Sequence, residues 1–477
     1  MKILFCTSEC HPFFKTGGLG DVAGALPKEM KKNGADVRVV LPFFSKIPQH
    51  FKEQCQVIDE FIVTVGWRKQ YCGVKYLRHD DIDYYFIDNL YYFDRPNIYG
   101  DYDDGEKFAF FQQAIIGMME RIDFIPDVMH LNDHHTAMIP FLLKEKYHWI
   151  QSYSQIKTML TIHNLEFQGQ YGADILSEVF GVGTERYEDG TIRFNDAVNC
   201  MKAGILYANK VTTVSPSYAR EIQTPEFGFG LDPILRMESH KIHGILNGID
   251  YDVYNPETDT RLEKTYSIDT LSLKKVNKAA LQKRLGLPER EDVPVIGMVS
   301  RLTYQKGFHV LLQELENLLQ FDLQVVLLGT GDPQFEEAFR YFGYKYPDKT
   351  SMNISFDEGL AQQIYAGSDL FLMPSATEPC GLSQMMAMRY GTLPIVHEIG
   401  GLRDSVQPFN PLTGEGTGFS FHNFQSYFLM ETLKRAVFLY KDEKHRFEQL
   451  MKQAMSQDFS WQQSCEQYLK LYEEMTY

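Results

Sequence analysis

The sequence predicts an α/β protein in which two domains each contain a doubly wound parallel sheet. Short apolar, β-branched runs alternate with longer helical patterns along most of the 477 residues, which is the pattern of βαβ units. These runs end in glycine, proline, serine, asparagine or histidine, and most of them lead into a helical pattern. A chain of this length has room for two domains or more, each with its own core.

The predicted strands are distributed along both halves of the chain. They are expected within residues 2–5, 36–44, 157–164, 210–216, 293–300, 323–331, 369–375 and 392–398. Ligands of doubly wound sheets lie beyond the carboxyl ends of the strands. The residues directly after these runs are therefore the candidates for function.

A turn-rich polar segment separates the two predicted domains. It begins at Asn247 with the letters NGIDYDVYNPETDTRL and is followed by a helical pattern that leads to a new strand. We place the first domain at residues 1–247 and the second at 248–458. Residues 459–477 have the pattern of an amphipathic helix.

Composition excludes several classes of protein. The net charge is −16, from 47 basic and 63 acidic side chains, whereas a general nucleic-acid binder presents a basic face. The first apolar run is too short for a secretory signal, and no apolar run is long enough to cross a bilayer. The seven cysteines form no C-x-x-C pair. We expect a soluble, cytoplasmic protein with no nucleic-acid or membrane partner.

The first candidate is the glycine-rich stretch KTGGLGD, which contains Lys15, Gly17 and Gly18 and follows the first predicted strand. Glycines let a ligand approach the backbone closely, and a turn that leads into a helix can bind an anion through free N–H groups. A tight turn with a solvated lysine is an equally good interpretation. The spacing fits neither a dinucleotide-binding fingerprint nor a P-loop.

Two more candidates follow strands of the second domain. The stretch SRLTYQKG places Arg301 and Lys306 where they could neutralise a diphosphate, although two solvated cations are the commoner outcome. In TEPCGLSQ, Pro379 suits the first turn of a helix, and Glu378 is either a capping carboxylate or a ligand for sugar hydroxyls. Cys380 is more consistent with a packed thiol than with a nucleophile.

The stretches HLNDHH and TIHN add Asp133 and His163 after strands of the first domain. The adjacent histidines of HLNDHH diverge on a helix or strand and lack regularly spaced carboxylates, so a metal site is the weaker interpretation. A lone histidine such as His163 is more often a hydrogen-bonded core residue than a catalyst. Each motif alone leaves its function open.

Taken together and in this order, the motifs resemble those of the bacterial glycogen synthase and plant starch synthase family. The matching stretches are KTGGLGDV, HLNDHH, TIHN, TTVSPSYAREI, EFGFGLD, ILNGID, SRLTYQKG and TEPCGLSQMMAMRYGTLPIV, with GTGFSF beyond them. The resemblance extends from residue 2 to about residue 465.

The resemblance implies a B-type glycosyltransferase with two Rossmann-like domains facing a deep cleft and a C-terminal helix that packs back on the first domain. Such an enzyme transfers glucose from ADP-glucose to the non-reducing 4-hydroxyl of an α-1,4-glucan such as glycogen. The α configuration is retained, and no metal or other cofactor is required.

The resemblance also implies roles for the candidate residues. The catalytic set would be Glu378 at the glucose, His163 beside the anomeric carbon, Arg301 and Lys306 at the diphosphate, and Asp133 facing the cleft. The substrate-binding set would be Lys15, Gly17, Gly18, Asn247, Cys380, Gly381 and Leu382. Three positions depart from common patterns: Met386 replaces the second glutamate of E-x7-E, Phe93 a tyrosine, and His134 a tryptophan.

Four alternatives stay open. A retaining glycoside hydrolase would need a second carboxylate beside Glu378, and a phosphorylase-like enzyme would need a lysine that binds pyridoxal phosphate. A non-catalytic glucan-binding protein would have lost residues from these motifs. A transferase that uses UDP-glucose would share them.

Overall fold

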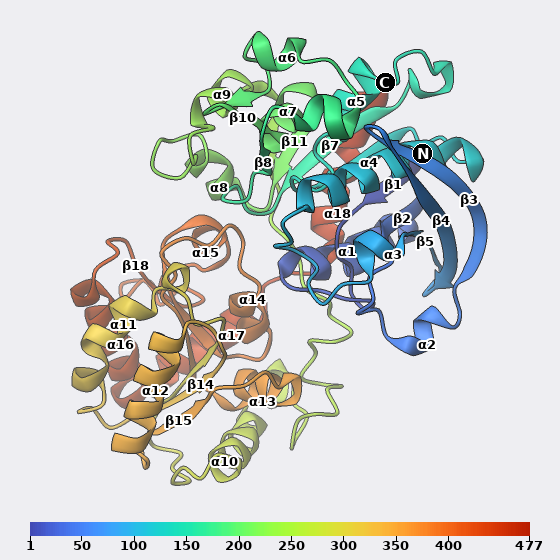
Figure 1. Ribbon diagram of the computed structural model, residues 1–477. Coiled ribbons are helices and arrows are strands. Elements are labelled where there is room, and N and C mark those ends of the chain that lie inside the picture. Colours follow the sequence, from blue (N-terminus) through green and yellow to red (C-terminus); the bar gives the residue numbers. More distant parts are fainter. The chain divides into compact units, whose positions relative to one another are not determined.

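The computed structural model describes residues 1–477 and divides them into two compact α/β units (Figure 1). The first unit comprises residues 1–247 and 461–477, and the second comprises residues 248–460. Each unit contains a predominantly parallel sheet with helices on both of its faces (Figure 1). The predicted fold class is confirmed.

The first unit is built on a nine-stranded sheet with the order β12-β11-β7-β6-β1-β2-β5-β4-β3. Its strands are β1 (Lys2–Cys6), β2 (Asp36–Pro42), β3 (Gln56–Val65), β4 (Arg68–His79), β5 (Ile82–Asp88), β6 (Val128–Asn132), β7 (Lys157–Ile162), β11 (Lys210–Thr213) and β12 (Ile242–Gly244). A small second sheet has β8 (Gln170–Tyr171), β10 (Ala197–Asn199) and β9 (Arg193–Phe194). The inner strands are buried on both faces, which explains their nearly continuous apolar runs.

One edge of this sheet departs from the all-parallel pattern that the sequence predicts. Strand β4 runs antiparallel to both β3 and β5. The turn between β4 and β5 consists of Asp80 and Asp81, which both have positive φ angles. Two consecutive residues in this conformation form the tight turn that matches the twist of antiparallel strands. The hairpin is therefore set by its turn and not by an apolar pattern.

The helices of the first unit are α1 (Gly18–Lys32), α2 (Gln49–Lys52), α3 (Leu90–Phe93), α4 (Asp104–Arg121), α5 (Ile139–Glu145), α6 (Glu185–Glu188), α7 (Cys200–Tyr207), α8 (Pro216–Glu221), α9 (Asp232–Met237) and α18 (Trp461–Thr476). Phe93, one of the three departures from the common patterns, is fully buried in an aromatic cluster with Phe44 and Phe110. Its position is therefore structural. None of the helices is long and apolar enough to span a membrane.

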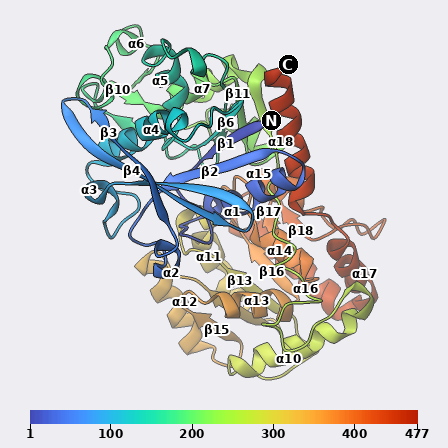
Figure 2. The same cartoon turned by 90° about the vertical axis from the view of Figure 1, so that its right-hand side faces the viewer.

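The C-terminal helix α18 packs on the first unit beside α1, as expected (Figure 2). The hydroxyl of its Tyr472 hydrogen-bonds the Nδ1 atom of His130 in β6, and the Nε2 atom of His130 hydrogen-bonds Thr161 in β7 at 2.6 Å. Ser464 of α18 donates a hydrogen bond to the carbonyl of Leu246. These buried polar contacts fix the register of the helix against the sheet.

The second unit contains a six-stranded, fully parallel sheet with the order β15-β14-β13-β16-β17-β18. Its strands are β13 (Val295–Val299), β14 (Gln324–Leu328), β15 (Thr350–Asn353), β16 (Leu370–Met373), β17 (Leu393–His397) and β18 (Phe419–Phe421). Its helices are α10 (Lys274–Arg284), α11 (Phe308–Leu318), α12 (Pro333–Lys345), α13 (Glu358–Gly367), α14 (Ser383–Arg389), α15 (Gly400–Ser405), α16 (Ser426–Asp442) and α17 (Lys444–Met455).

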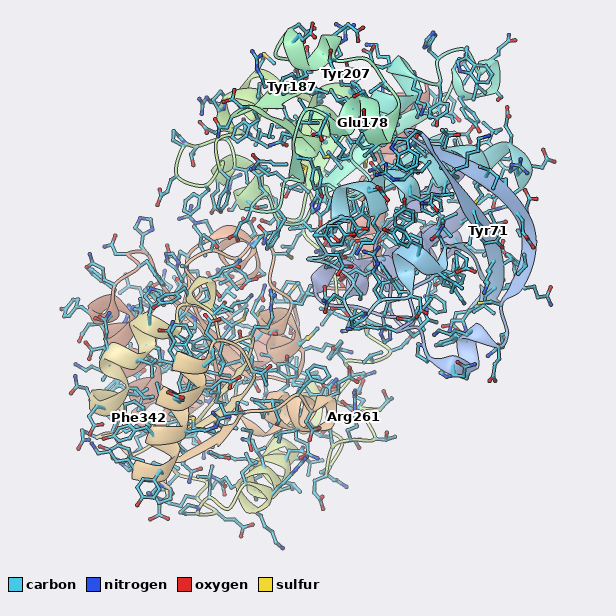
Figure 3. All side chains as sticks on the ribbon, in the orientation of Figure 1. Tyr71, Glu178, Tyr187, Tyr207, Arg261 and Phe342 are labelled. Atoms are coloured by element: carbon cyan, nitrogen blue, oxygen red, sulfur yellow. The ribbon has the colours of Figure 1, made fainter.

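The polar segment that opens the second unit is folded and packs within that unit. The guanidinium of Arg261, labelled in Figure 3, donates a hydrogen bond to the buried carboxylate of Asp259 at 2.8 Å. The same carboxylate accepts a 2.6 Å hydrogen bond from Tyr390, whose carbonyl in turn accepts one from Tyr266. These contacts attach the segment to the helix layer of α14.

Candidate functional site

In both sheets, the strand order reverses direction beside the first strand. Strand β1 lies between β2 and β6, and β13 lies between β14 and β16. Loops diverge at such a switch point, so the carboxyl edge there is where ligands of this fold bind. Lys15 follows β1 and Asp133 follows β6 in the first unit. Lys306 follows β13 and Glu378 follows β16 in the second unit.

A buried carboxylate holds the glycine-rich loop of the first unit. The Oε1 atom of Glu9 accepts hydrogen bonds from the backbone N–H groups of Gly17 at 3.1 Å and Gly20 at 3.0 Å. Its Oε2 atom accepts hydrogen bonds from Thr16 at 2.7 Å and Tyr99 at 2.9 Å. Glu9 was not predicted from the sequence. The N–H groups of these glycines were expected to bind a ligand, whereas that of Gly17 is bound within the protein.

The glycines of this loop differ in the space around their Cα atoms. A Cβ atom on Gly20 would lie 2.3 Å from that of Lys15, so the loop can pass the start of α1 only with glycine there. No atom lies within 4 Å of a Cβ placed on Gly17 or Gly18, and both residues leave open space above the backbone. Lys15 is exposed and forms an ion pair with Asp21 at 2.7 Å. This surface leaves room for a substrate next to a lysine.

Asp133 and His163 lie together at the ends of β6 and β7. The carboxylate of Asp133 accepts a hydrogen bond from the backbone N–H of His163 at 2.7 Å, and Asp133 has a φ angle of 59°. The Nε2 atom of His163 lies 2.9 Å from Oδ1 of Asn132. The amide of Asn132 donates its own hydrogen bond to the carbonyl of Cys6, so its oxygen must face the imidazole. His163 is therefore protonated on Nε2 and presents Nδ1 as an acceptor.

Burial changes the protonation of both residues in opposite directions. It raises the pKa of Asp133 to about 7, with a further contribution from the negative charge of Glu9. Burial lowers the pKa of His163 to about 3, which keeps the imidazole neutral at physiological pH. Asp133 therefore titrates near neutrality, and His163 acts there as a hydrogen-bonding group without charge.

The first unit should lose stability as the pH falls below about 6.5. Burial lowers the pKa values of His130 and His163 to about 3 and of His134 to about 4. Between these values and the ordinary value of 6.5, the unfolded chain binds protons that the folded chain does not, so acid favours unfolding. Asp133 contributes with the opposite sign, but the three histidines outnumber it. Thermal melting of the protein between pH 7.5 and 4.5 checks this, and a melting temperature that rises with acid contradicts it.

In the second unit, Lys306 and Glu378 form a partly buried ion pair. The Nζ atom of Lys306 donates a hydrogen bond to Oε2 of Glu378 at 2.8 Å, and Ser375 donates a second one to the same oxygen at 2.9 Å. The carboxylate side chain is only 8 % exposed. Its Oε1 atom accepts no hydrogen bond within the protein and is available to a ligand hydroxyl. The sequence analysis missed Ser375.

A close approach of two loops positions this pair. The backbone N–H of Ala376, in the loop after β16, donates to the carbonyl of Gln305, in the loop after β13. Gly307 has a φ angle of 80°, and a Cβ atom on it would lie 1.8 Å from the carbonyl oxygen of Pro374. Arg301 lies on the same loop as Lys306, but its side chain is exposed and forms no hydrogen bond or ion pair. The structure does not join the two cations in one contact.

Replacing Gly307 by alanine should therefore disrupt the site. The left-handed conformation alone costs about 1–2 kcal/mol with a Cβ atom, and the clash with Pro374 forces the two loops apart. We expect a lower melting temperature and a large loss of activity. Gly286 also has a positive φ angle, but open space surrounds it, so Gly286→Ala is the control for backbone strain without a clash. Equal losses of melting temperature and activity in the two variants would contradict the importance of the contact between the two loops.

Cys380, Gly381 and Leu382 lie in a loop and not in a helix, which corrects the prediction that a helix begins at Pro379. Gly381 has a φ angle of 72°, which no right-handed helix contains, and α14 starts only at Ser383. Cys380 is buried, in agreement with a packed thiol.

Two further glycines, which the sequence analysis did not select, support this loop. A Cβ atom on Gly400 would lie 1.9 Å from the carbonyl oxygen of Glu378, and one on Gly401 would lie 2.1 Å from that of Cys380. The backbone N–H of Gly401 donates a hydrogen bond to the carbonyl of Glu378. Tight packing against α15 thus fixes the backbone that carries the carboxylate.

Asn247 is the remaining predicted residue, and it is buried at the end of the first unit's main segment. Its Oδ1 atom has no hydrogen-bond partner in the protein. A buried acceptor without a partner is costly unless a ligand or water satisfies it. No group of three or more His, Cys, Asp or Glu side chains is arranged to bind a metal ion.

Two doubly wound units with polar side chains at their switch points are the architecture of B-type glycosyltransferases, among other classes of protein. Comparison with known proteins then places this chain within the class. Residues 2–237 match the model of the starch synthase catalytic domain, and residues 281–452 match that of the glycosyl transferases group 1. The chain belongs to the family of bacterial glycogen synthases and plant starch synthases.

Similar proteins cover the whole chain. It is 62 % identical to a glycogen synthase of Ligilactobacillus salivarius over 476 residues, and 62 % identical to one of Streptococcus sanguinis over 475 residues, with each match covering 100 % of both chains. The catalytic domain of starch synthase IV from Arabidopsis thaliana, solved with ADP and acarbose, matches with a TM-score of 0.92 and 32 % identity, covering 100 % of this chain and 99 % of that one. A sucrose-phosphate synthase from Thermosynechococcus elongatus shares the fold, with a TM-score of 0.63 and 17 % identity over 99 % of this chain and 98 % of that one.

Proposed function

We propose that this protein is a glycogen synthase that transfers glucose from ADP-glucose to the non-reducing 4-hydroxyl of an α-1,4-glucan and retains the α configuration. The observation that carries the proposal is the match of about 60 % identity to glycogen synthases along the full chain. ADP as the leaving group is supported by the ADP-bound starch synthase of the same fold.

The second unit supplies groups suited to the donor. Lys306 is a cation at the carboxyl edge of the sheet beside the switch point, and it can exchange part of its contact with Glu378 for the phosphates of the donor. Glu378 then keeps its bond from Ser375, and its Oε1 atom accepts from a glucose hydroxyl. Charge on the departing ADP is stabilised by Lys306 and by Arg301, whose guanidinium is uncommitted.

The first unit supplies hydrogen-bonding groups suited to the sugar. His163 carries no charge near neutral pH, and Asp133 titrates in this range. Open space above Gly17 and Gly18 leaves room for a substrate near Lys15. We propose that protein cations replace a metal ion in this reaction, and that the enzyme works in the cytoplasm without nucleic-acid or membrane partners.

Release of ADP in the presence of glycogen tests the proposal directly. We expect turnover with ADP-glucose, much slower turnover with UDP-glucose, and an unchanged rate in excess EDTA. Glycogen binding without any nucleotide release would instead favour a non-catalytic glucan-binding protein. Faster turnover with UDP-glucose would correct the donor, and loss of activity in EDTA would correct the metal-free reaction.

A further inference from the structure

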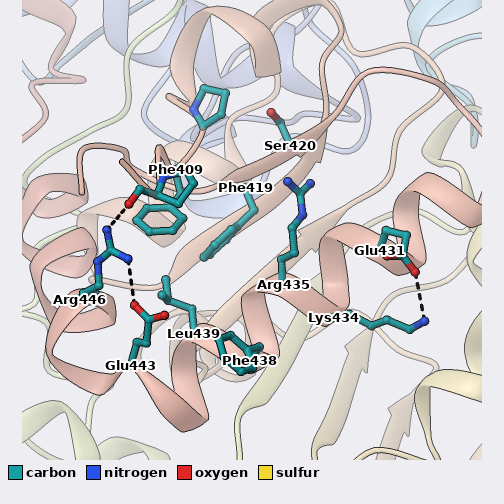
Figure 4. Close-up of a pocket in the computed structure, with 12 residues that line it drawn as sticks. Phe409, Phe419, Ser420, Glu431, Lys434, Arg435, Phe438, Leu439, Glu443 and Arg446 are labelled. Atoms are coloured by element: carbon teal, nitrogen blue, oxygen red, sulfur yellow. Dashed lines mark hydrogen bonds and ion pairs between the residues drawn. The ribbon is translucent and has the colours of Figure 1, made fainter. Parts of the chain in front are cut away.

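The second unit contains a pocket that includes none of the predicted site residues (Figure 4). Its volume is about 390 Å³, within the range of sites that bind small organic ligands. It lies between β18, the segment that precedes β18, and the helices α16 and α17. Its lining includes the rings of Phe409, Phe419 and Phe438 and five charged side chains, which are named below.

This pocket is separate from the switch point of the sheet. β18 is the edge strand, and β16 and β17 lie between it and β13. Neighbouring strands are about 4.8 Å apart, which places the pocket roughly 14 Å from β13 across the sheet. The pocket therefore needs a function other than binding of the reacting glucose.

The walls of the pocket are held in place without a ligand. The N–H of Phe409 donates to the carbonyl of Gly418 at 2.8 Å, and Gln453 of α17 accepts a hydrogen bond from the N–H of Gly416 at 2.9 Å. The guanidinium of Arg446 donates to the carbonyl of Pro411 and lies 5.2 Å from the ring centroid of Phe409. A preformed pocket binds a ligand without a further ordering cost.

Aromatic rings and paired charges line the pocket together. Figure 4 shows the rings of Phe409 and Phe419 on one side and the guanidinium of Arg435 on the other. Four of the five charged side chains are paired with each other: Lys434 with Glu431 at 3.1 Å, and Arg446 with Glu443 at 2.9 Å. Only Arg435 lacks a carboxylate partner, and it donates a hydrogen bond to Thr432.

This chemistry favours a neutral, polyhydroxylated ligand over an anion. A phosphate group is normally bound by more than one uncommitted cation or by several backbone N–H groups, and the pocket offers one such cation. Ion-paired carboxylates and guanidinium groups remain good acceptors and donors for hydroxyls. Aromatic faces pack against the apolar C–H faces of a hexose ring.

We propose that the pocket is a second binding site for the α-glucan acceptor, away from the reacting chain end. The inference rests on the proposed function, because that function supplies the polymer. A glucan particle carries many chain ends, so attachment through one chain raises the effective concentration of the others around the enzyme. The site would thus lower KM for glycogen without changing the chemical step.

The double substitution Phe438→Ala with Arg435→Ala tests this site. Both side chains are exposed on α16, so the fold should persist, and equal melting temperatures verify it. The matched control is Tyr344→Ala with Arg340→Ala on α12, an aromatic and an arginine one turn apart on an exposed face of the same unit. Migration in gels containing glycogen is measured without ADP-glucose, and ADP release is measured at saturating maltotriose.

We expect the pocket variant to bind glycogen about fivefold more weakly or worse, which is typical when binding side chains are truncated. The control should bind like the unsubstituted protein, and all three should have equal rates with maltotriose. Equal retardation by glycogen in all three proteins would overturn the inference. If inorganic phosphate raises the melting temperature of the unsubstituted protein and of the control but not of the pocket variant, the pocket is an anion site and the inference is overturned. Absence of ADP release from the unsubstituted protein would refute the proposed function, and the gels would still test the pocket.

Discussion

Glu378→Gln should reduce the turnover number by about 10²–10³-fold, the usual cost of removing one preorganised electrostatic contact from an active site. The amide keeps the shape of the carboxylate and can still accept from Ser375, but it no longer offsets positive charge on the sugar. Because Lys306 loses its partner, its charge becomes free for phosphate, and ADP should bind at least as tightly as before. Steady-state rates and calorimetric titration with ADP measure the two effects.

The matched control for this substitution is Glu316→Gln. Glu316 forms an exposed ion pair with Lys345 at the same N–O distance of 2.8 Å. Its substitution therefore removes an equal charge from the same unit. Its activity should be unchanged. Full activity in Glu378→Gln would remove this carboxylate from the site. A hexose covalently attached to Glu378 in mass spectra of the enzyme with donor alone would replace direct transfer by double displacement.

Lys306→Ala and Arg301→Ala should each lower the turnover number by about a hundredfold or more, because both cations are proposed to stabilise charge on the leaving ADP. The two variants should differ in a second respect. Lys306→Ala leaves the buried carboxylate of Glu378 without its ion pair and should lower the melting temperature. The side chain of Arg301 is exposed and forms no hydrogen bond or ion pair, so Arg301→Ala should melt like the unsubstituted protein.

Lys345→Ala is the control for loss of a lysine from the second unit, and its rate should be normal because its ion pair is exposed. Weaker ADP binding in both Lys306→Ala and Arg301→Ala would agree with a diphosphate clamp. Rates equal to that of the unsubstituted protein in both variants would show that the two residues are ordinary surface charges.

The fold could be predicted because buried parallel strands are nearly continuous apolar runs. The strands β1, β7, β13 and β16 all correspond to such runs, and the switch-point rule then selected the residues that follow them. The antiparallel hairpin of β4 and β5 could not be found in this way. Strand direction cannot be read from the buried apolar run of β5, and the turn depends on two aspartates in an unusual conformation.

The supporting residues of the site were missed for a different physical reason. Glu9 and Asn132 contact Tyr99 and His163 only after distant segments have packed together, whereas Ser375 contacts Glu378 three positions along the same loop. A sequence pattern shows which residues follow a strand, but it does not show which side chains meet across a sheet edge. The pairing of Lys306 with Glu378 across 72 positions of the chain is of the same kind.

The helix predicted to begin at Pro379 was wrong because proline is only one of the signals for a helix start. Gly381 adopts a left-handed conformation two residues later, and this conformation delays the helix to Ser383. Glycine is compatible with either a helix or a turn, so the sequence alone does not decide between the two conformations.

The position of α18 has a consequence for biosynthesis. The ribosome releases residues 461–477 after the whole second unit, although they complete the unit that residues 1–247 begin. Between the two parts lie residues 248–460, which a ribosome adding about 5–20 residues per second needs roughly 10–40 s to produce. During this time, the face of the nascent first unit that will receive Tyr472 and Trp461 stays uncovered by its own chain. The first unit therefore reaches its final packing only after α18 has left the exit tunnel.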